Sequence, residues 1–227
     1  MDLRGLGTVT TMVTLAEDLF LLASEASTGR QLIDTTHLDL GLGGALLLDL
    51  VLQQRIALHD SRVKVTDPRP TGVALLDRAL SDIAATKAHE PGHWLWHLTH
   101  SLRRTVKDRL IEAGVLCRDD HKVLGVIRIH RTHETDGRLH HELDDHLHDA
   151  VVQGHHPSRE TAALASLALA VGLDQRLFPC SDRRAVRQRM AEVASECPEC
   201  EWVADALHRA VDASDAALGI TPTGELP

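Results

Sequence analysis

The sequence predicts a mainly helical fold, a single domain built around one buried central helix with small β-hairpins at its periphery. The longest strongly apolar run, Leu38 to Leu58, is apolar on nearly every side of a helix, which is typical of a helix surrounded by others. Aromatic residues make up only 2% of the sequence and tyrosine is absent, so the core must consist of leucine, alanine and valine. That composition favours helix packing over a sheet sandwich, because strands draw on aromatic and β-branched residues.

We expect one domain over residues 14–218, with tails at 1–13 and 219–227, because 227 residues suffice to bury a sizeable core. Asp49 interrupts the apolar run, which therefore favours a buried helix over a membrane span. Residues 1–14 contain no continuous apolar segment of the kind found in signal peptides, so we expect a cytoplasmic protein. Four cysteines in a chain of this size do not indicate a disulfide framework.

The first half of the chain gives three local signals. Thr14 is expected to cap a short first helix, with Glu17 at the capping-box position. After the central helix, residues 56–65 alternate between apolar and polar around the turn residues Asp60-Ser61, which predicts a β-hairpin. A helix carrying the apolar positions from Leu75 to Ile83 should follow.

The second half of the chain is predicted to be mostly helical. Residues 93–115 show the spacing of one long amphipathic helix that Gly114 ends. A second hairpin is expected over 123–139, with an extended piece at 123–129 and Asp136-Gly137 as the turn signal. Further helices are predicted at 159–177, 182–193 and 201–218.

Four blocks of this sequence carry a resemblance to a known family. They are GLGGALLLDLVLQQRIAL, VKVTDPRPTGVALLDRAL, DRLIEAGVL and RETAALASLALAVGLDQRLFP, and the second contains the turn PTG-x-x-LLD at Pro70 to Asp77. In this order they resemble the Golgi phosphoprotein 3 family over roughly residues 14–190. Sparse lysine, alongside abundant arginine, alanine and leucine, is similar to the actinobacterial members. The resemblance implies a mostly helical domain with peripheral hairpins, and the eukaryotic members bind phosphatidylinositol 4-phosphate on Golgi membranes.

The resemblance also implies a headgroup pocket made of one tryptophan and three arginines. Carried over position by position, the tryptophan falls on Asp34 and the arginines fall on Gly43, His100 and Arg103, so only the last is kept. Neighbouring cations on the predicted 93–115 helix still offer a positive face to phosphate oxygens. The candidate lipid headgroup-binding residues are therefore Arg103, His100, Arg104, Lys107, Gly43 and Asp34.

The second hairpin is the other candidate for membrane contact. In the family the corresponding apolar hairpin is implicated in membrane contact and in self-association. Here apolar residues alternate with arginine and histidine, a mixture that suits an anionic bilayer surface. The expected contact residues are Leu124, Val126, Ile127, Arg128 and Arg131. The alternative is an ordinary strand that covers the core.

Charge limits the classes of partner. The formal net charge of -9 disfavours nucleic-acid binding and indiscriminate adhesion to anionic membranes, so membrane contact should be local. Most of the 16 histidines lie between His89 and His156, so that this region could become positive at mildly acidic pH. A winged-helix-like DNA module before Asp67 ranks lower, because its hairpin carries only Arg62 and Lys64 as cations.

Metal and cofactor signals are weak. His93, His97 and His100 recur at helical spacing and Cys197 and Cys200 form a C-x-x-C, but no second ligand pair stands at a zinc-site distance from that pair. A histidine-rich metal-binding protein is therefore the alternative function, and no cofactor is expected. The glycines at 41, 43 and 44 are expected to permit close helix approach, since no phosphate-loop lysine or serine follows them.

No G-x-S-x-G elbow or other catalytic arrangement is present, so we expect no enzyme activity. The predicted function is that of a non-catalytic, peripherally membrane-associated or adaptor protein. Its expected partner is an anionic phospholipid surface. A protein partner and a homo-oligomer formed through the hairpin are further possibilities.

Overall fold

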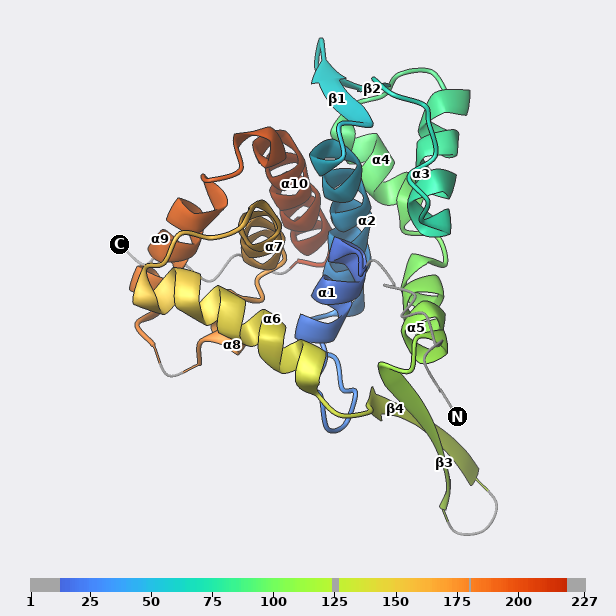
Figure 1. The fold of residues 1–227 in the computed structure, drawn as a ribbon, viewed down its shortest axis with the longest axis vertical. Helices are drawn as coiled ribbons and strands as arrows, with labels where there is room; N and C mark the ends of the chain where they lie inside the picture. The colour runs from blue at the N-terminus through green and yellow to red at the C-terminus, as the bar shows by residue number, and fades with distance from the viewer. Residues whose placement is uncertain (1–12, 124–126, 180, 220–227) are drawn as a thin grey trace, which may run out of the picture.

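Figure 1 shows a mainly helical fold with two small antiparallel hairpins and a buried central helix, as the sequence predicts. The computed structural model describes residues 13–123, 127–179 and 181–219, and for residues 119–123 and 127–131 it describes the backbone only. The strands are β1 (Ile56–His59), β2 (Arg62–Val65), β3 (Leu116–Val123) and β4 (Ile127–Glu134). The α-helices are α1 (Leu15–Leu22), α2 (Thr35–Leu52), α3 (Ala74–Ala85), α4 (Pro91–Leu98), α5 (Leu102–Glu112), α6 (Arg138–His148), α7 (Arg159–Ala170), α8 (Asp174–Leu177), α9 (Arg183–Ala194) and α10 (Glu201–Ala217). A π-helical turn (Asp149–Gln153) follows α6, and a 3-10 turn (Pro198–Cys200) precedes α10.

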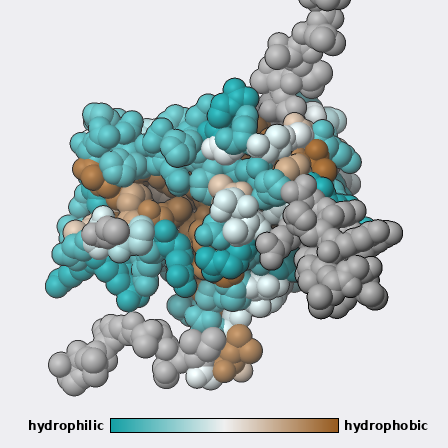
Figure 2. Space-filling view, turned by 90° about the horizontal axis from the view of Figure 1, so that it is seen from below, coloured by the Kyte–Doolittle hydropathy of each residue, from teal (hydrophilic) through white to brown (hydrophobic). Residues whose placement is uncertain are grey.

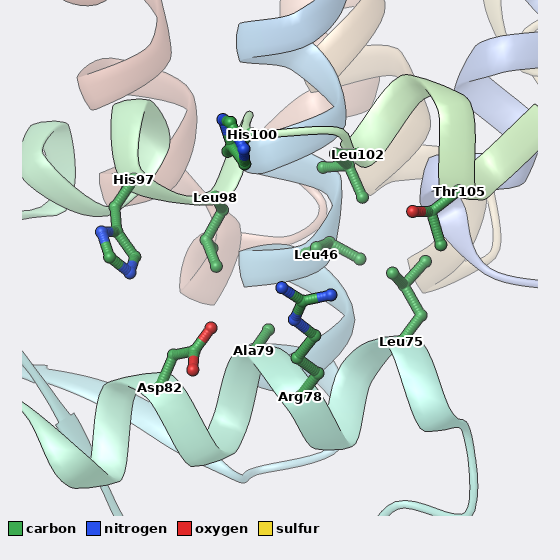
Figure 3. Close-up of a pocket in the computed structure, with 10 residues that line it drawn as sticks. All are labelled: Leu46, Leu75, Arg78, Ala79, Asp82, His97, Leu98, His100, Leu102 and Thr105. Carbon is green, nitrogen blue, oxygen red and sulfur yellow. The ribbon is translucent and has the colours of Figure 1, made fainter.

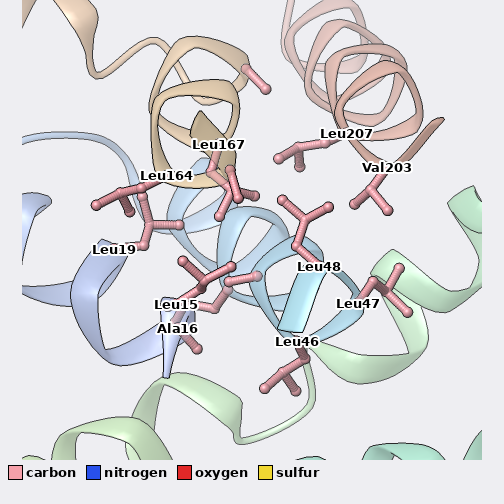
Figure 4. Close-up of a cluster of buried hydrophobic side chains, with 14 of the residues drawn as sticks. Leu15, Ala16, Leu19, Leu46, Leu47, Leu48, Leu164, Leu167, Val203 and Leu207 are labelled. Carbon is pink, nitrogen blue, oxygen red and sulfur yellow. The ribbon is translucent and has the colours of Figure 1, made fainter. Parts of the chain in front are cut away.

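Helix α2 is the axis of the fold, and α1, α4, α7 and α10 pack around it (Figure 1). Leu46, Leu47 and Leu48 leave α2 in different directions, and Leu48 faces α10 (Figure 4). All three are at most 2% exposed, and each fully buried leucine contributes about 1.5–3 kcal/mol. Among the described residues α2 alone is long and apolar enough to cross a membrane, but 72% of it is buried, which identifies it as a core helix.

Glycines in α2 allow this close packing. A Cβ atom at Gly43 would lie 2.9 Å from the backbone oxygen of Leu95 in α4, and one at Gly41 would lie 2.8 Å from Val171. The prediction that these glycines permit close helix approach is confirmed. At Gly43 the obstacle is backbone, which cannot move aside as a side chain can.

The start of α1 is held by carboxylates. Thr14 caps the helix and forms a capping box with Glu17, as predicted. Asp49, from the middle of α2, accepts a hydrogen bond from the backbone N–H of Leu15 at 3.0 Å. One polar residue in the central helix thus satisfies a donor at the end of a neighbouring helix.

These carboxylates form a buried acidic cluster, which we define as Glu17, Asp18 and Asp49. Glu17 is 3% exposed and pairs with Arg109 of α5, with 2.9 Å between Oε1 and Nε. Burial raises the pKa of Asp18 to about 7 and that of Asp49 to about 8. Neighbouring acids, including Glu160 of α7, raise the pKa of Asp49 further, while the N–H of Leu15 opposes the shift.

The first hairpin and the turn that follows it agree with the sequence. β1 pairs with β2, and Asp60 and Ser61 have φ angles of 53° and 60°, as a two-residue turn between antiparallel strands requires. Thr71 donates from its N–H and its hydroxyl to Oδ1 of Asp77, at 2.5 and 2.7 Å. The turn PTG-x-x-LLD therefore closes on the first turn of α3.

The prediction of one long helix over 93–115 is wrong. The segment forms α4 and α5, separated at Ser101, whose φ of 56° is in the left-handed region and cannot continue a right-handed helix. The buried stripe and the stop at Gly114, which has a φ of 74°, are confirmed. The helix predicted over 159–177 is likewise divided into α7 and α8, with Gly172 at a φ of 74° between them.

The second hairpin is longer than predicted and begins earlier. β3 pairs with β4 from Leu116 opposite Glu134 to Val123 opposite Ile127. Asp136-Gly137 leads into α6 instead of joining strands, and Gly137 has a φ of 66°. The strands carry many charged residues and lack the apolar alternation that identifies strands, which is why their bounds were misplaced.

Candidate functional site

The start of α2 carries negative charge. Asp34 caps the helix, accepting from the N–H groups of Thr36 and His37 at 2.7 and 3.2 Å. The ring of His37 lies 3.0 Å from Asp34 and 2.8 Å from Asp215, and so links α2 to the end of α10. Asp34 is therefore engaged in capping, and its carboxylate would repel a phosphate.

Arg103 of α5 faces Asp39 of α2. Its Nε lies 3.4 Å from Oδ1 of Asp39, but the geometry is not that of a hydrogen bond, and this buried oxygen accepts none. Burial raises the pKa of Asp39, Arg103 offsets part of that rise, and Asp34 adds to it. The guanidinium of Arg103 is paired electrostatically but keeps unused donors.

Cations crowd together where α5 meets β3. We define the α5–β3 cluster as Arg103, Arg104, Lys107 and Arg118. Asp108 lies 3.7 Å from Arg104 and 3.6 Å from Arg118, so one carboxylate is shared between two guanidinium groups. Burial and then the charges of Arg118 and Arg103 lower the pKa of Lys107, and Asp108 offsets only part of this. The cluster therefore has an excess of positive charge.

The β3–β4 hairpin projects from the helical body at the end of α5, so that the cluster lies at its base (Figure 1). On β4, Ile127, Arg128 and Arg131 pair with Val123, Lys122 and Asp119, whereas Leu124 and Val126 lie outside the described residues. Viewed from this end, the described surface left visible is mainly hydrophilic, with a hydrophobic area toward its left and middle and smaller hydrophobic spots elsewhere (Figure 2).

A pocket of about 420 Å³ opens between α3 and the corner of α4 and α5 (Figure 3). Arg78 extends from α3 toward apolar side chains, and His97 extends from α4 toward α3. His100 also lines this pocket, whereas Arg103 pairs with Asp39. The break at Ser101 therefore separates two residues that a continuous helix would have placed on one face.

The described histidines and cysteines were candidates for metal ligands. The rings of His89 and His93 stack with centroids 4.0 Å apart, and those of His93 and His97 lie nearly parallel at 5.9 Å. Cys197 and Cys200 are buried and joined by a disulfide. In the described part of the chain, no group of three or more histidine, cysteine or acidic residues could hold a metal ion. The metal-binding alternative gains no support there.

Residues 15–214 match the family model described as Golgi phosphoprotein 3 (GPP34). The chain belongs to the Golgi phosphoprotein 3 family. Proteins of this family are peripheral membrane proteins, generally non-catalytic adaptors, and the family is known for binding phosphatidylinositol 4-phosphate. A comparison with curated proteins gives no significant match.

The four positions to which the resemblance assigns the headgroup pocket have different surroundings in this chain. Asp34 caps α2, and Gly43 is buried against the backbone of Leu95. His100 lines the α3 pocket, which leaves Arg103 as the only one of the four in the cationic cluster. A side chain at position 43 would meet the backbone of Leu95, so the glycine is matched to the close packing of α4 on α2.

The sequence interpretation missed two cations, Arg118 and Arg78. Arg118 comes from a strand whose bounds were misplaced, so no spacing connected it with Lys107. Arg78 lies three residues after Leu75 and four before Asp82 on α3. Helical spacing could have placed these side chains on neighbouring parts of one face, but nothing in the sequence indicated which helix would lie opposite.

Proposed function

We propose that this member of the Golgi phosphoprotein 3 family binds anionic phospholipid membranes peripherally, without catalysis, through the α5–β3 cluster. The observation that best supports this is the crowding of positive charge around Lys107. Burial disfavours its protonated form most, the charges of Arg118 and Arg103 add to this, and Asp108 compensates only partly. Phosphate oxygens from a lipid headgroup would supply the missing negative charge and accept from the guanidinium groups in a bidentate manner.

The magnitudes fit a weak and reversible contact. Each lysine or arginine near an anionic bilayer contributes about 1 kcal/mol, and the attraction decays over a Debye length of about 8 Å at physiological ionic strength. The overall charge of -9 repels the same surface, so only a protein oriented with the cluster toward the bilayer would bind. The projecting hairpin then lies at the membrane side of the molecule.

Charge density, and not one headgroup, should decide the binding. Because Arg103 alone of the four pocket positions keeps the residue type that the resemblance implies, we expect vesicles of phosphatidylglycerol, cardiolipin or phosphatidylinositol 4-phosphate to bind equally when their surface charge is matched. Self-association through the hairpin, a protein partner and a cytoplasmic location stay predictions.

Co-sedimentation with liposomes tests the proposal. Binding to anionic vesicles and not to phosphatidylcholine is expected. It should be lost near 1 M salt, where the Debye length is about 3 Å. The double variant Lys107→Ala/Arg118→Ala should reduce binding about tenfold or more, since two contacts of about 1 kcal/mol each are removed.

Arg184→Ala is the matched control, because it removes an exposed cation from α9, on the other side of α2 (Figure 1). It should change binding by less than twofold. Equal effects of the control and the double variant, or salt-insensitive binding, would contradict a role for the cluster. Selective binding of phosphatidylinositol 4-phosphate at matched surface charge would contradict binding by charge density alone.

A further inference from the structure

The pocket between α3 and the α4–α5 corner has the character of a ligand site that is separate from the α5–β3 cluster. Its volume of about 420 Å³ is within the range of roughly 300–1,000 Å³ that small-molecule sites occupy. Leu46, Leu75, Ala79, Leu98 and Leu102 give it an apolar lining contributed by α2, α3, α4 and α5. Such a lining with a few polar groups at the rim is the usual composition of a binding site for a small amphiphile.

The charges at the rim select the sign of the ligand. The side chain of Arg78 makes no hydrogen bond or ion pair with any residue in the described part of the chain. The residue is exposed, and its guanidinium extends toward the apolar side chains of the pocket with donors free for a ligand (Figure 3). His97 and His100 add imidazole donors, and Asp82 is the single carboxylate among the lining residues. The pocket therefore complements an acidic head attached to an apolar body.

We propose that this pocket binds an amphiphilic organic anion, a carboxylate or phosphate head on Arg78 with its alkyl chain on the leucine lining. The acidic head could come from a fatty acid or from a phosphorylated lipid, and soluble short-chain probes distinguish these two sources. The inference is independent of membrane contact through the α5–β3 cluster, because neither Arg78 nor the lining leucines belong to it.

Isothermal titration calorimetry of the full chain, with probes kept below their micelle concentrations, tests the proposal. Octanoate represents the carboxylate and octyl phosphate the phosphorylated lipid, while inorganic phosphate has the head alone and octanol the chain alone. We expect saturable binding of at least one octyl anion, at least tenfold tighter than inorganic phosphate and octanol, since each buried methylene adds up to about fourfold in affinity. Preference for one of the two octyl anions identifies the source.

Two variants on α3 give effects of opposite sign. Arg78→Gln should weaken binding of the preferred octyl anion about tenfold, the usual loss for a charge-assisted hydrogen bond. Asp82→Asn should strengthen it several-fold by removing the carboxylate at the rim. Arg184→Gln is the matched control on α9 and should leave affinity unchanged, and all three substituted residues lie at the surface, so unaltered circular dichroism is expected.

The proposal is overturned if no octyl anion binds, if inorganic phosphate or octanol binds as tightly as the octyl anions, or if Arg78→Gln binds like the unaltered chain. Because the experiment contains no vesicles, its outcome is separate from that of liposome binding.

Discussion

Two charge clusters include residues of α5, and each has an excess of one sign of charge. The α5–β3 cluster has more cations than carboxylates and is open to solvent in part, with Arg104 85% and Arg118 53% exposed. The buried acidic cluster has three carboxyl groups and one guanidinium, from Arg109. In the first, burial and neighbouring cations lower the pKa of a lysine, and in the second, burial and neighbouring carboxylates raise the pKa of two aspartates.

The two clusters differ in the kind of partner that can neutralise their excess charge. The acidic cluster lies where α1, α2, α5 and α7 pack together, and burial favours the protonated forms of Asp18 and Asp49. The cationic cluster faces outward beside the projecting hairpin, where a phosphate or a bilayer can approach (Figure 1). We therefore expect substitutions in the acidic cluster to change the stability of the fold, and substitutions in the α5–β3 cluster to change the binding of anions.

Removing Arg109 from the acidic cluster should have the largest effect on stability. Arg109→Ala leaves Glu17, which is 3% exposed, without a cation beside Asp18 and Asp49. Loss of one partner of a buried ion pair costs about 3–5 kcal/mol, so we expect a decrease of about 3 kcal/mol in the free energy of unfolding measured with urea. In a Glu17→Gln background the same substitution should cost much less. An equal cost in both backgrounds would show that Arg109 acts through packing alone.

Asp49→Asn should change how the stability of the fold depends on pH. The pKa of Asp49 is about 8 in the fold against an ordinary value of 3.8, so the folded chain holds this proton more tightly than the unfolded chain. The resulting stability is complete below about pH 4 and is lost as the pH rises to about 8. Asparagine keeps an acceptor for the N–H of Leu15 and removes the charge.

We therefore expect Asp49→Asn to stabilise the protein above pH 8 by at least about 1 kcal/mol, the equivalent of one pKa unit, and to flatten the dependence on pH. Urea unfolding across this pH range measures it. Asp212→Asn, on the surface of α10, is the control and should leave the dependence unchanged. Destabilisation of Asp49→Asn at high pH would show that the carboxylate is ionised and needed.

Much of this fold follows from local sequence signals. The apolar run predicts α2, the Thr14 capping box predicts the start of α1, and Asp60-Ser61 predicts the first hairpin. The break between α4 and α5 does not follow, because Ser101 is an ordinary helix residue in composition and no glycine marks its left-handed conformation.

The sites were less accessible to sequence reasoning, because each depends on contacts between elements. The residues predicted on one helix face are divided between the pocket, which includes His100, and the cluster, which includes Arg103 and Lys107. Arg118 joins Lys107 only through the packing of β3 on α5. Local spacing identified cations on α5 correctly but could not assign their partners.

The smallest expected effect concerns Lys107. Its lowered pKa means that at neutral pH its positive charge destabilises the fold, and that this destabilisation is lost as the pH rises through the lowered value. Because the residue is partly exposed, solvent screening limits the effect to a few tenths of a kcal/mol. Lys107→Ala should therefore leave the melting temperature unchanged or slightly raised, in contrast to Arg109→Ala.

A soluble polyanion that binds the α5–β3 cluster should stabilise the unaltered chain, because a ligand that binds only the folded state raises its stability by mass action. We expect tripolyphosphate to raise the melting temperature by about 1–2 °C at low ionic strength, an increase that Lys107→Ala or added salt removes and that Arg184→Ala retains. Because tripolyphosphate has no alkyl chain, it tests the α5–β3 cluster and not the α3 pocket. An increase that persists in Lys107→Ala would show that the anion binds elsewhere. The exposed α5–β3 cluster would then have no demonstrated role in binding anions.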